Sequence, residues 1–460
     1  MKSKATRTPV LRIFCMILSA AILTVMLAGC GLISKYPPGT DSNTGNTGKT
    51  DEPTEPHSSV TDPSDTGVTG SVTGSEMQPK PSESDESKTE EPTGSETEAP
   101  TESATETDTA TETEKQSESA TVTEPTEPST STPVIREPTV VDTSKAKYTY
   151  DEMCGDLAEL ASEYSGIFSY YEIGRSADGR SIYVAVLGSG KASKQIISEA
   201  GTHGREYINP LFVMATLEYY LKNYDVPFFG AEGQKKTVRE ILSDTDLYVI
   251  PMLNPDGITI SQLGVDALKT EALRKGVRKI YDDARAAGNT SWSFETYQTQ
   301  WKANARGVDI NRNFDIKAPA GYEKEITVTA PAGSGYPGEE PGSEPETKAY
   351  MDFVSGLSNP VACISYHSLG QLIYWDCGQD YSGRITALKL AEAAKDQSGY
   401  MVYSVKSFTA ASSDWCMLKK GIPSITIETG GGYSHPLSIN EFEAIFEKCR
   451  NIYLAAALLY

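Results

Sequence analysis

The chain has 460 residues and a formal net charge of −22, with 63 acidic and 41 basic side chains. A chain of this length can bury a large core, and the lack of a basic patch argues against nucleic acid as a partner. No internal repeat and no phosphate-binding glycine loop occurs, which excludes repeat proteins and P-loop enzymes. Only four histidines are present, so the position of each is informative.

The first 30 residues have the pattern of a bacterial lipoprotein signal peptide. Four basic residues among the first twelve precede an apolar stretch, Ile13–Ala28, that is short for a membrane span. The stretch ends in Leu-Ala-Gly-Cys30, which resembles the lipobox, a motif whose cysteine is lipidated. The alternative is an ordinary secretory signal with a chance cysteine. We expect Cys30 to carry lipid and to anchor the mature protein to the outer face of the bacterial cell membrane.

Residues 31–145 are predicted to form a disordered tether. The segment is rich in Thr, Ser, Glu and Pro, and no aromatic residue lies between Tyr36 and Tyr148. Residues 41–140 carry 23 acidic and 5 basic side chains, a net charge of −18, so most of the acidity of the chain lies here. A segment with so little apolar surface to bury cannot offset the entropy lost on ordering.

Residues 146–460 are predicted to form one α/β domain, because apolar runs alternate with helical patterns. The expected strands are 181–188, 195–200, 247–253, 361–366 and 424–427. The expected helices are 151–164, 209–224, 384–397 and 440–459. The cysteines of this region have no regular spacing, so neither a disulfide framework nor a thiolate metal site is predicted: Cys154, Cys363, Cys377, Cys416 and Cys449.

Four polar residues each follow the carboxyl end of an expected strand. They are His203, Asn254, His367 and Glu428. Ligand sites of open α/β sheets gather at this edge, so segments that are far apart in sequence are expected to meet in one pocket.

A metal site is predicted among these residues. His203 and Glu206 are three residues apart, so both side chains can reach one ion from a turn, and His367 supplies a third ligand. Two imidazoles and one carboxylate are a ligand set for a catalytic Zn²⁺, which keeps a fourth position open. The alternative is that both histidines are hydrogen-bonded core residues.

Several motifs together resemble the zinc carboxypeptidase family that includes the pancreatic carboxypeptidases. The resemblance covers nearly all of residues 146–460, and it implies a mixed, mostly parallel sheet flanked by helices, with one Zn²⁺ held by His203, Glu206 and His367. The matching stretches are Thr202–Glu206, Pro251–Gly257, Gly307–Phe314, Ser365–Trp375, Asp414–Trp415 and Pro423–Gly430.

The resemblance also implies roles for residues beyond the ligands. Glu428 would be the general base that takes a proton from the attacking water, although a buried, ion-paired carboxylate is the alternative. Asn311 and Arg312 would bind the terminal carboxylate of the substrate, unless Arg312 pairs with a neighbouring aspartate. The arginine that stabilises the oxyanion in relatives aligns with Lys302, and Arg306 lies further along the same segment. Either cation can meet the charge requirement, so we name Arg306 as the candidate and keep Lys302 as the alternative.

The substrate is suggested by the bacterial branch of this family, whose γ-D-glutamyl-meso-diaminopimelate peptidases trim peptidoglycan. The sequence segments around Arg306 and His367 are most similar to that branch. Ser413 aligns with the residue that lines the specificity pocket, and its small neutral side chain predicts a pocket without a counter-charge. The tyrosine that caps the substrate in pancreatic relatives would fall at Lys406. The alternatives are a general extracellular carboxypeptidase and a non-catalytic surface-binding module.

Overall fold

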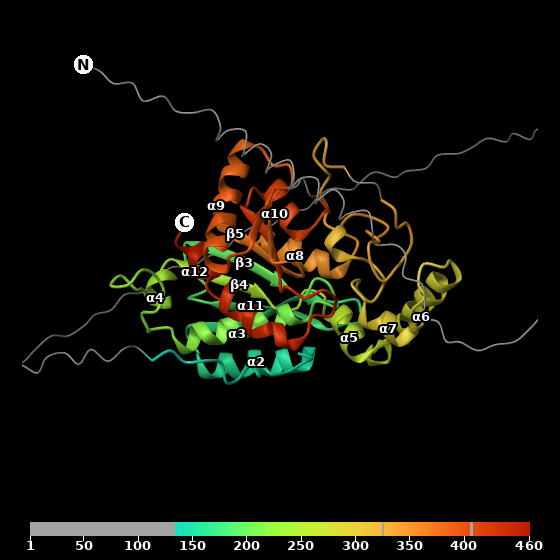
Figure 1. Ribbon diagram of the computed structural model, residues 1–460, viewed down its shortest axis with the longest axis horizontal. Coiled ribbons are helices and arrows are strands. Elements are labelled where there is room, and N and C mark those ends of the chain that lie inside the picture. Colours follow the sequence, from blue (N-terminus) through green and yellow to red (C-terminus); the bar gives the residue numbers. More distant parts are fainter. Residues whose placement is uncertain (1–133, 324–325, 405–407) are drawn as a thin grey trace, which may run out of the picture. The chain divides into compact units, whose positions relative to one another are not determined.

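The computed structural model describes residues 134–460 except 324–325 and 405–407 (Figure 1). The expected signal peptide, Cys30, most of the expected tether and Lys406 lie outside the described residues. The described chain starts ahead of the boundary that we expected at residue 146. Here the backbone N–H groups of Thr139, Val140 and Val141 donate to the buried Glu218 carboxylate at 2.6, 2.9 and 2.8 Å. This segment therefore packs against the folded domain.

Eight strands form one mixed sheet in the order β1-β2-β4-β3-β5-β8-β6-β7. The central strands β4, β3, β5 and β8 are parallel, whereas β1 and β2 are antiparallel and β6 runs against β8. The sheet expected from the family resemblance is thus confirmed. The strands are β1 Phe168–Arg175, β2 Ser181–Leu187, β3 Lys194–Ala200, β4 Thr245–Ile250, β5 Pro360–Ser368, β6 Leu372–Tyr374, β7 Met401–Tyr403 and β8 Ser424–Thr429.

Helices cover both faces of the sheet (Figure 1). Alternate residues of the strands point to opposite faces, so Ala185 and Leu187 of β2 pack in one core and Val184 and Val186 in the other. The first core holds α2 Tyr150–Glu163, α3 Ile208–Lys222, α9 Tyr381–Ser398, α11 Phe442–Cys449 and α12 Ile452–Ala457. The second holds α8 Pro345–Ser355 and α10 Ser412–Lys420.

A third, smaller core surrounds the fully buried Trp301. It is built from α5 Pro255–Leu263, α6 Glu271–Ala286 and α7 Phe294–Thr299. The remaining elements are α4 Val238–Ile241 and 3₁₀ turns at Val265–Ala267, Ile310–Arg312 and Ile439–Glu441. Within the described part of the chain, no helix is both long and apolar enough to cross a membrane.

The expected helix 440–459 is wrong in its continuity, because it divides into a 3₁₀ turn, α11 and α12. At the break, the Tyr220 hydroxyl of α3 donates a hydrogen bond to the Arg450 carbonyl. The Tyr220 hydroxyl thus provides a hydrogen-bond donor for a carbonyl at the end of α11, where the hydrogen bonds within the helix stop. The apolar stripe is still buried, with Ile445, Cys449 and Ile452 in the first core.

Candidate active site

Three side chains from two segments form a possible metal site. His203 and Glu206 lie in the turn between β3 and α3, and His367 lies near the carboxyl end of β5. One ligand atom from each lies within 4.8 Å of the others, and all three residues are buried. His203 Nδ1 is 2.9 Å from Glu206 Oε1, and His367 Nδ1 is 3.0 Å from Glu206 Oε2. The ligand trio predicted from the sequence is brought together.

The turn that carries His203 is held by close backbone packing. Asn254 caps α5 by accepting from Gly257 N–H at 2.9 Å, and its amide donates to the Thr202 carbonyl at 3.0 Å. A Cβ placed on Gly204 would lie 2.3 Å from the Gly257 carbonyl oxygen, so only glycine permits this approach. Asn254, which also follows a strand, therefore positions the turn rather than the substrate.

Asp309 completes the site behind His203. His203 Nε2 lies 3.1 Å from Asp309 Oδ1, and Asp309 is 1% exposed. Burial would raise the pKa of Asp309, but the charges of His203, Lys302 and Arg312 hold it well below its usual range. The carboxylate therefore favours a proton on Nε2 and leaves the Nδ1 lone pair for a metal. The sequence analysis gave Asp309 no functional role.

The donor set fits a dication. With Nε2 protonated, the Nδ1 lone pair of His203 faces His367 Nδ1 at 3.1 Å and a Glu206 carboxylate oxygen at 2.9 Å, so three electron-pair donors converge where a cation can bind. Burial would lower the pKa of His367, but its hydrogen bond to Glu206 and the charges of Glu206 and Glu428 raise it to about 9. Two nitrogens and a carboxylate are ligands that Zn²⁺ accepts.

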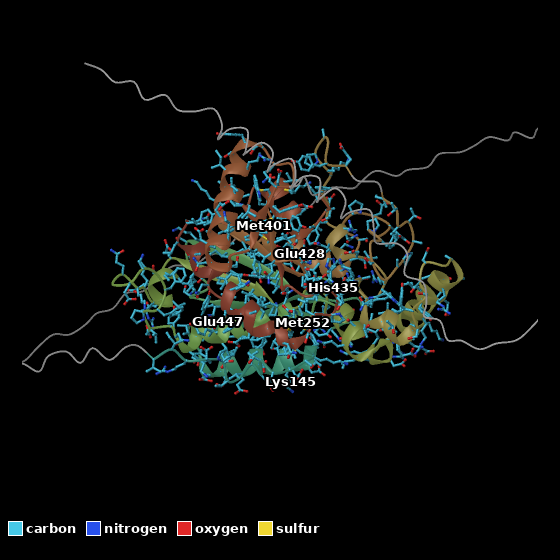
Figure 2. All side chains as sticks on the ribbon, viewed as in Figure 1. Lys145, Met252, Met401, Glu428, His435 and Glu447 are labelled. Atoms are coloured by element: carbon cyan, nitrogen blue, oxygen red, sulfur yellow. The ribbon has the colours of Figure 1, made fainter. Side chains whose placement is uncertain are left out.

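Glu428 lies beside these ligands, near the end of β8. In the parallel pair of β5 and β8 it is the register partner of His367, so both side chains lie on the same face of the sheet. Figure 2 labels it among the C-terminal elements in the middle of the domain. Burial raises the pKa of Glu428, and the Glu206 charge adds to this while the His367 charge opposes it. A carboxylate with a raised pKa next to a metal site is suited to accept and return a proton.

The two candidate cations lie in different places. The Lys302 ammonium is 3.8 Å from Glu206 Oε1 and its side chain is 21% exposed. Arg306 instead points toward Glu344, 3.6 Å away, and is half-exposed. Glu344 also accepts from Asn304 at 2.7 Å, so the partner of Arg306 is a carboxylate outside the metal ligands. The expectation that Arg306 faces the site is therefore wrong, and Lys302 is the cation at the metal ligands.

Asn311 and Arg312 lie in the 3₁₀ turn Ile310–Arg312 and line two neighbouring cavities. Asn311 lines the cavity that contains Glu428, whereas Arg312 lines a wider groove of about 600 Å³, and Thr409 belongs to both. Arg312 Nε is 3.5 Å from Asp309 Oδ2, so the pairing left open in the sequence analysis is present, although long. Its side chain is 40% exposed and remains accessible.

Comparison with known proteins now decides the family. The zinc carboxypeptidase family matches residues 153–447. The chain belongs to this family. The γ-D-glutamyl-L-diamino acid endopeptidase 1 of Lysinibacillus sphaericus is 28% identical over 320 residues, covering 68% of this chain and 72% of that protein. Bovine carboxypeptidase A1 is 26% identical over 282 residues, covering 58% of each chain. This family is zinc-dependent, and the chain is a peptidase.

The fold agrees with this assignment. The crystal structure of thrombin-activatable fibrinolysis inhibitor superposes with a TM-score of 0.52 at 19% identity, covering 70% of this chain and 77% of that one. The likeness shows the zinc carboxypeptidase fold. The ligand trio and Glu428 lie at the edge of the sheet that the strand pattern indicated, and Lys302 reaches them from the segment after α7.

Beside Glu428 this zinc carboxypeptidase has a cavity of about 220 Å³. Ser413 lines it, as its alignment predicted, and the Ser413 and Thr426 hydroxyls lie 2.9 Å apart. Asp376 and Asp414 line it too. Asp376 is paired with Arg384 at 2.7 Å, and Asp414 accepts from the backbone N–H groups of Thr409 and Ala411. The expectation that the pocket offers no counter-charge therefore stays a prediction.

His435 is a further residue that the sequence analysis did not assign. Its Nε2 is 2.7 Å from the Ser368 carbonyl and 4.0 Å from Glu206 Oε1 (labelled in Figure 2). The Gln300 amide donates to the His435 carbonyl at 2.7 Å and holds this loop. Burial and the Arg205 charge lower the pKa of His435. His435 lies well into the loop after β8 and not directly after the strand, so the pattern that found His203 and His367 could not find it.

Proposed function

We propose that this peptidase hydrolyses the bond between γ-D-glutamate and meso-diaminopimelate in peptidoglycan stem peptides. The observation that carries the proposal is the polar cavity beside Glu428, which suits a side chain with charged groups better than an aromatic or aliphatic one. The similarity to a γ-D-glutamyl-L-diamino acid endopeptidase over 72% of that protein supports the same substrate class.

Each residue of the site has a part in such a reaction. His203, Glu206 and His367 would hold the zinc, which when bound polarises the scissile carbonyl and activates water. Glu428 accepts the proton of the attacking water and then passes it to the leaving amine. Lys302 offers a positive charge where the carbonyl oxygen becomes negative. Asn311 and Arg312 bind the carboxylate at the end of the substrate, with the guanidinium as a two-point donor.

Two other functions were considered. A non-catalytic binding module would not need a general base, and this chain retains Glu428 beside the metal ligands. A general extracellular carboxypeptidase would use the same residues on ordinary peptides, and the specificity pocket is what separates it from the proposed enzyme. A substrate with an apolar C-terminal side chain would displace water from the pocket that Asp376 and Asp414 line. It would not replace the hydrogen bonds of that water.

The test is a comparison of kcat/KM for three substrates. A γ-D-glutamyl-meso-diaminopimelate peptide should be preferred to peptides that end in phenylalanine or arginine. A preference of tenfold or more for Phe or Arg, about 1.4 kcal/mol of discrimination, would instead establish the general carboxypeptidase.

We further propose that the enzyme is held by lipid at Cys30 on the outer face of the cell membrane, where a long acidic tether would let it reach the cell wall. The support is the lipobox-like sequence alone. Cys30→Ser should release the protein from membranes, because the acyl chains supply the binding energy. A Cys30→Ser protein that stays with membranes after a high-salt wash would contradict this proposal.

A further inference from the structure

One fully buried carboxylate near the metal ligands has no part in the reaction described above. Glu199 lies in β3, close to the metal-binding turn that follows this strand, and none of its surface is exposed. In the parallel pair of β3 and β5 it is the register partner of Ser365. Ser365 and His367 are two residues apart in β5 and so point to the same face of the sheet. The Glu199 side chain therefore lies on the face that carries His367.

Three hydroxyl groups hold this carboxylate, and each comes from a different part of the site. Glu199 Oε2 accepts from the Thr202 hydroxyl, which belongs to the metal-binding turn. Glu199 Oε1 accepts from the Ser365 hydroxyl of β5 and, at 2.8 Å, from Ser412 Oγ. Ser412 is the first residue of α10, and its neighbour Ser413 lines the pocket beside the general base. One side chain thus joins the turn, the strand and the helix that carry the site.

These contacts orient the Glu199 charge but do not cancel it. Hydroxyl groups are neutral, and no lysine, arginine or histidine in the described part of the chain forms an ion pair with Glu199. A buried carboxylate without an opposite charge is strongly unfavourable, and replacing it by a neutral group of the same shape is often stabilising. The retention of this charge therefore indicates a positive partner that the polypeptide does not supply.

Several other buried carboxylates of the domain have such a partner within the chain. Asp178 and Asp256 share Arg180 at 2.6 and 2.8 Å, and Glu218 lies 3.5 Å from the Lys222 ammonium. Near Glu199, the positive charge that the site acquires is the zinc dication that the ligand trio would hold. The position of Glu199 thus fits a charge kept for the metal.

We propose that Glu199 is a positioning residue of the zinc site, which ties its three segments together and adds a negative charge that strengthens zinc binding. It acts through Thr202 and Ser365, and it is not one of the three ligands. The inference concerns zinc affinity and not the peptide that is cleaved. Its failure would therefore leave the proposed substrate untouched, and failure of the proposed substrate would leave Glu199 in this role.

Replacing Glu199 by glutamine removes the charge and keeps the shape of the side chain. The three hydroxyls can accept as well as donate hydrogen bonds, so they can turn toward the new amide. We expect the zinc dissociation constant of Glu199→Gln, measured by competition with a chelator, to rise about tenfold or more. We expect the melting temperature of the metal-stripped protein to stay the same or to rise, because an uncompensated buried charge is gone.

These two measurements separate the proposed role from a purely structural one. A residue that only supports the fold would lower the melting temperature with and without zinc and leave the zinc dissociation constant unchanged, and this result would overturn the proposal. Glu218→Gln is the matched control. Glu218 is also buried, but it accepts from the backbone N–H groups of Thr139, Val140 and Val141. Its replacement should lower the melting temperature and leave zinc affinity unchanged.

A second variant tests the charge apart from the shape. Glu199→Asp keeps the charge but draws the carboxylate back from the hydroxyls, so we expect a lower melting temperature together with near wild-type zinc affinity. This outcome is the reverse of that expected for Glu199→Gln. If Glu199→Gln does not fold, Glu199→Asp still decides, because a loss of about tenfold or more in its zinc affinity would overturn the role assigned to the charge.

Discussion

Replacing Asp309 by asparagine should weaken zinc binding although Asp309 is not itself a ligand. Asp309 Oδ1 accepts from His203 Nε2 at 3.1 Å, and its Oδ2 accepts from Gly335 N–H at 3.0 Å. An asparagine has one oxygen and one NH₂ group in these positions. Whichever way the amide turns, its NH₂ faces a donor, so either the contact to His203 or the contact to Gly335 is lost. The negative charge behind the imidazole is lost in both cases.

The size of the effect follows from that contact. A hydrogen bond to a charged group contributes roughly 1.5–3 kcal/mol. Loss of the carboxylate partner of a ligand histidine typically costs about 10–100-fold in metal affinity, or about 1.4–2.7 kcal/mol. We therefore expect the zinc dissociation constant of Asp309→Asn to rise by this factor, because the Nδ1 lone pair is no longer oriented and is less basic.

The assay is competition for zinc with a chelator of known affinity, at neutral pH. Asp315→Asn, an exposed neighbour on the same segment, is the control and should leave the affinity unchanged. Activity of Asp309→Asn should return at high zinc concentration, which separates weak binding from misfolding. An unchanged dissociation constant in a folded Asp309→Asn enzyme would refute the role assigned to Asp309.

Three further predictions concern the same site. Glu428→Gln should keep zinc and the melting temperature but lose about 10²–10⁴-fold in kcat, and near wild-type turnover would require another base. Lys302→Ala should lower kcat by about 10²–10³-fold, whereas Arg306→Ala should change it little. A larger loss of kcat in Arg306→Ala than in Lys302→Ala would instead assign the oxyanion role to Arg306. Zinc must displace the proton that His367 holds below about pH 9, so zinc affinity measured from roughly pH 6 to 8 should rise about tenfold per unit, whereas a flat profile would contradict this.

The two histidine ligands and Glu428 were predictable because each polar residue comes at the end of an apolar strand run. A buried parallel strand is a nearly continuous apolar run, and a polar residue just after it must lie at the carboxyl edge of the sheet. β3, β5 and β8 all follow this rule, with His203 and His367 at the first two and Glu428 at the third. Positions along the chain were therefore enough to place them together.

The remaining assignments depend on where side chains point, which is set by tertiary packing and not by local sequence. Lys302 and Arg306 lie in one irregular segment, and only the packing of Trp301 and the Asn304–Glu344 contact decides which cation faces the zinc ligands. The strand ahead of Asp376, β6, has three residues at the less buried end of the sheet, too few for a period to be recognised. The acidic wall of the pocket therefore became visible only in three dimensions.

The most direct test of the central claim is to digest purified muropeptides with the zinc-loaded enzyme and to identify the products by mass. The account predicts release of meso-diaminopimelate from stem tripeptides by cleavage after γ-D-glutamate, and loss of this product when a chelator removes the zinc. Muropeptides that remain intact, under conditions where an ordinary peptide loses its C-terminal residue, would contradict it.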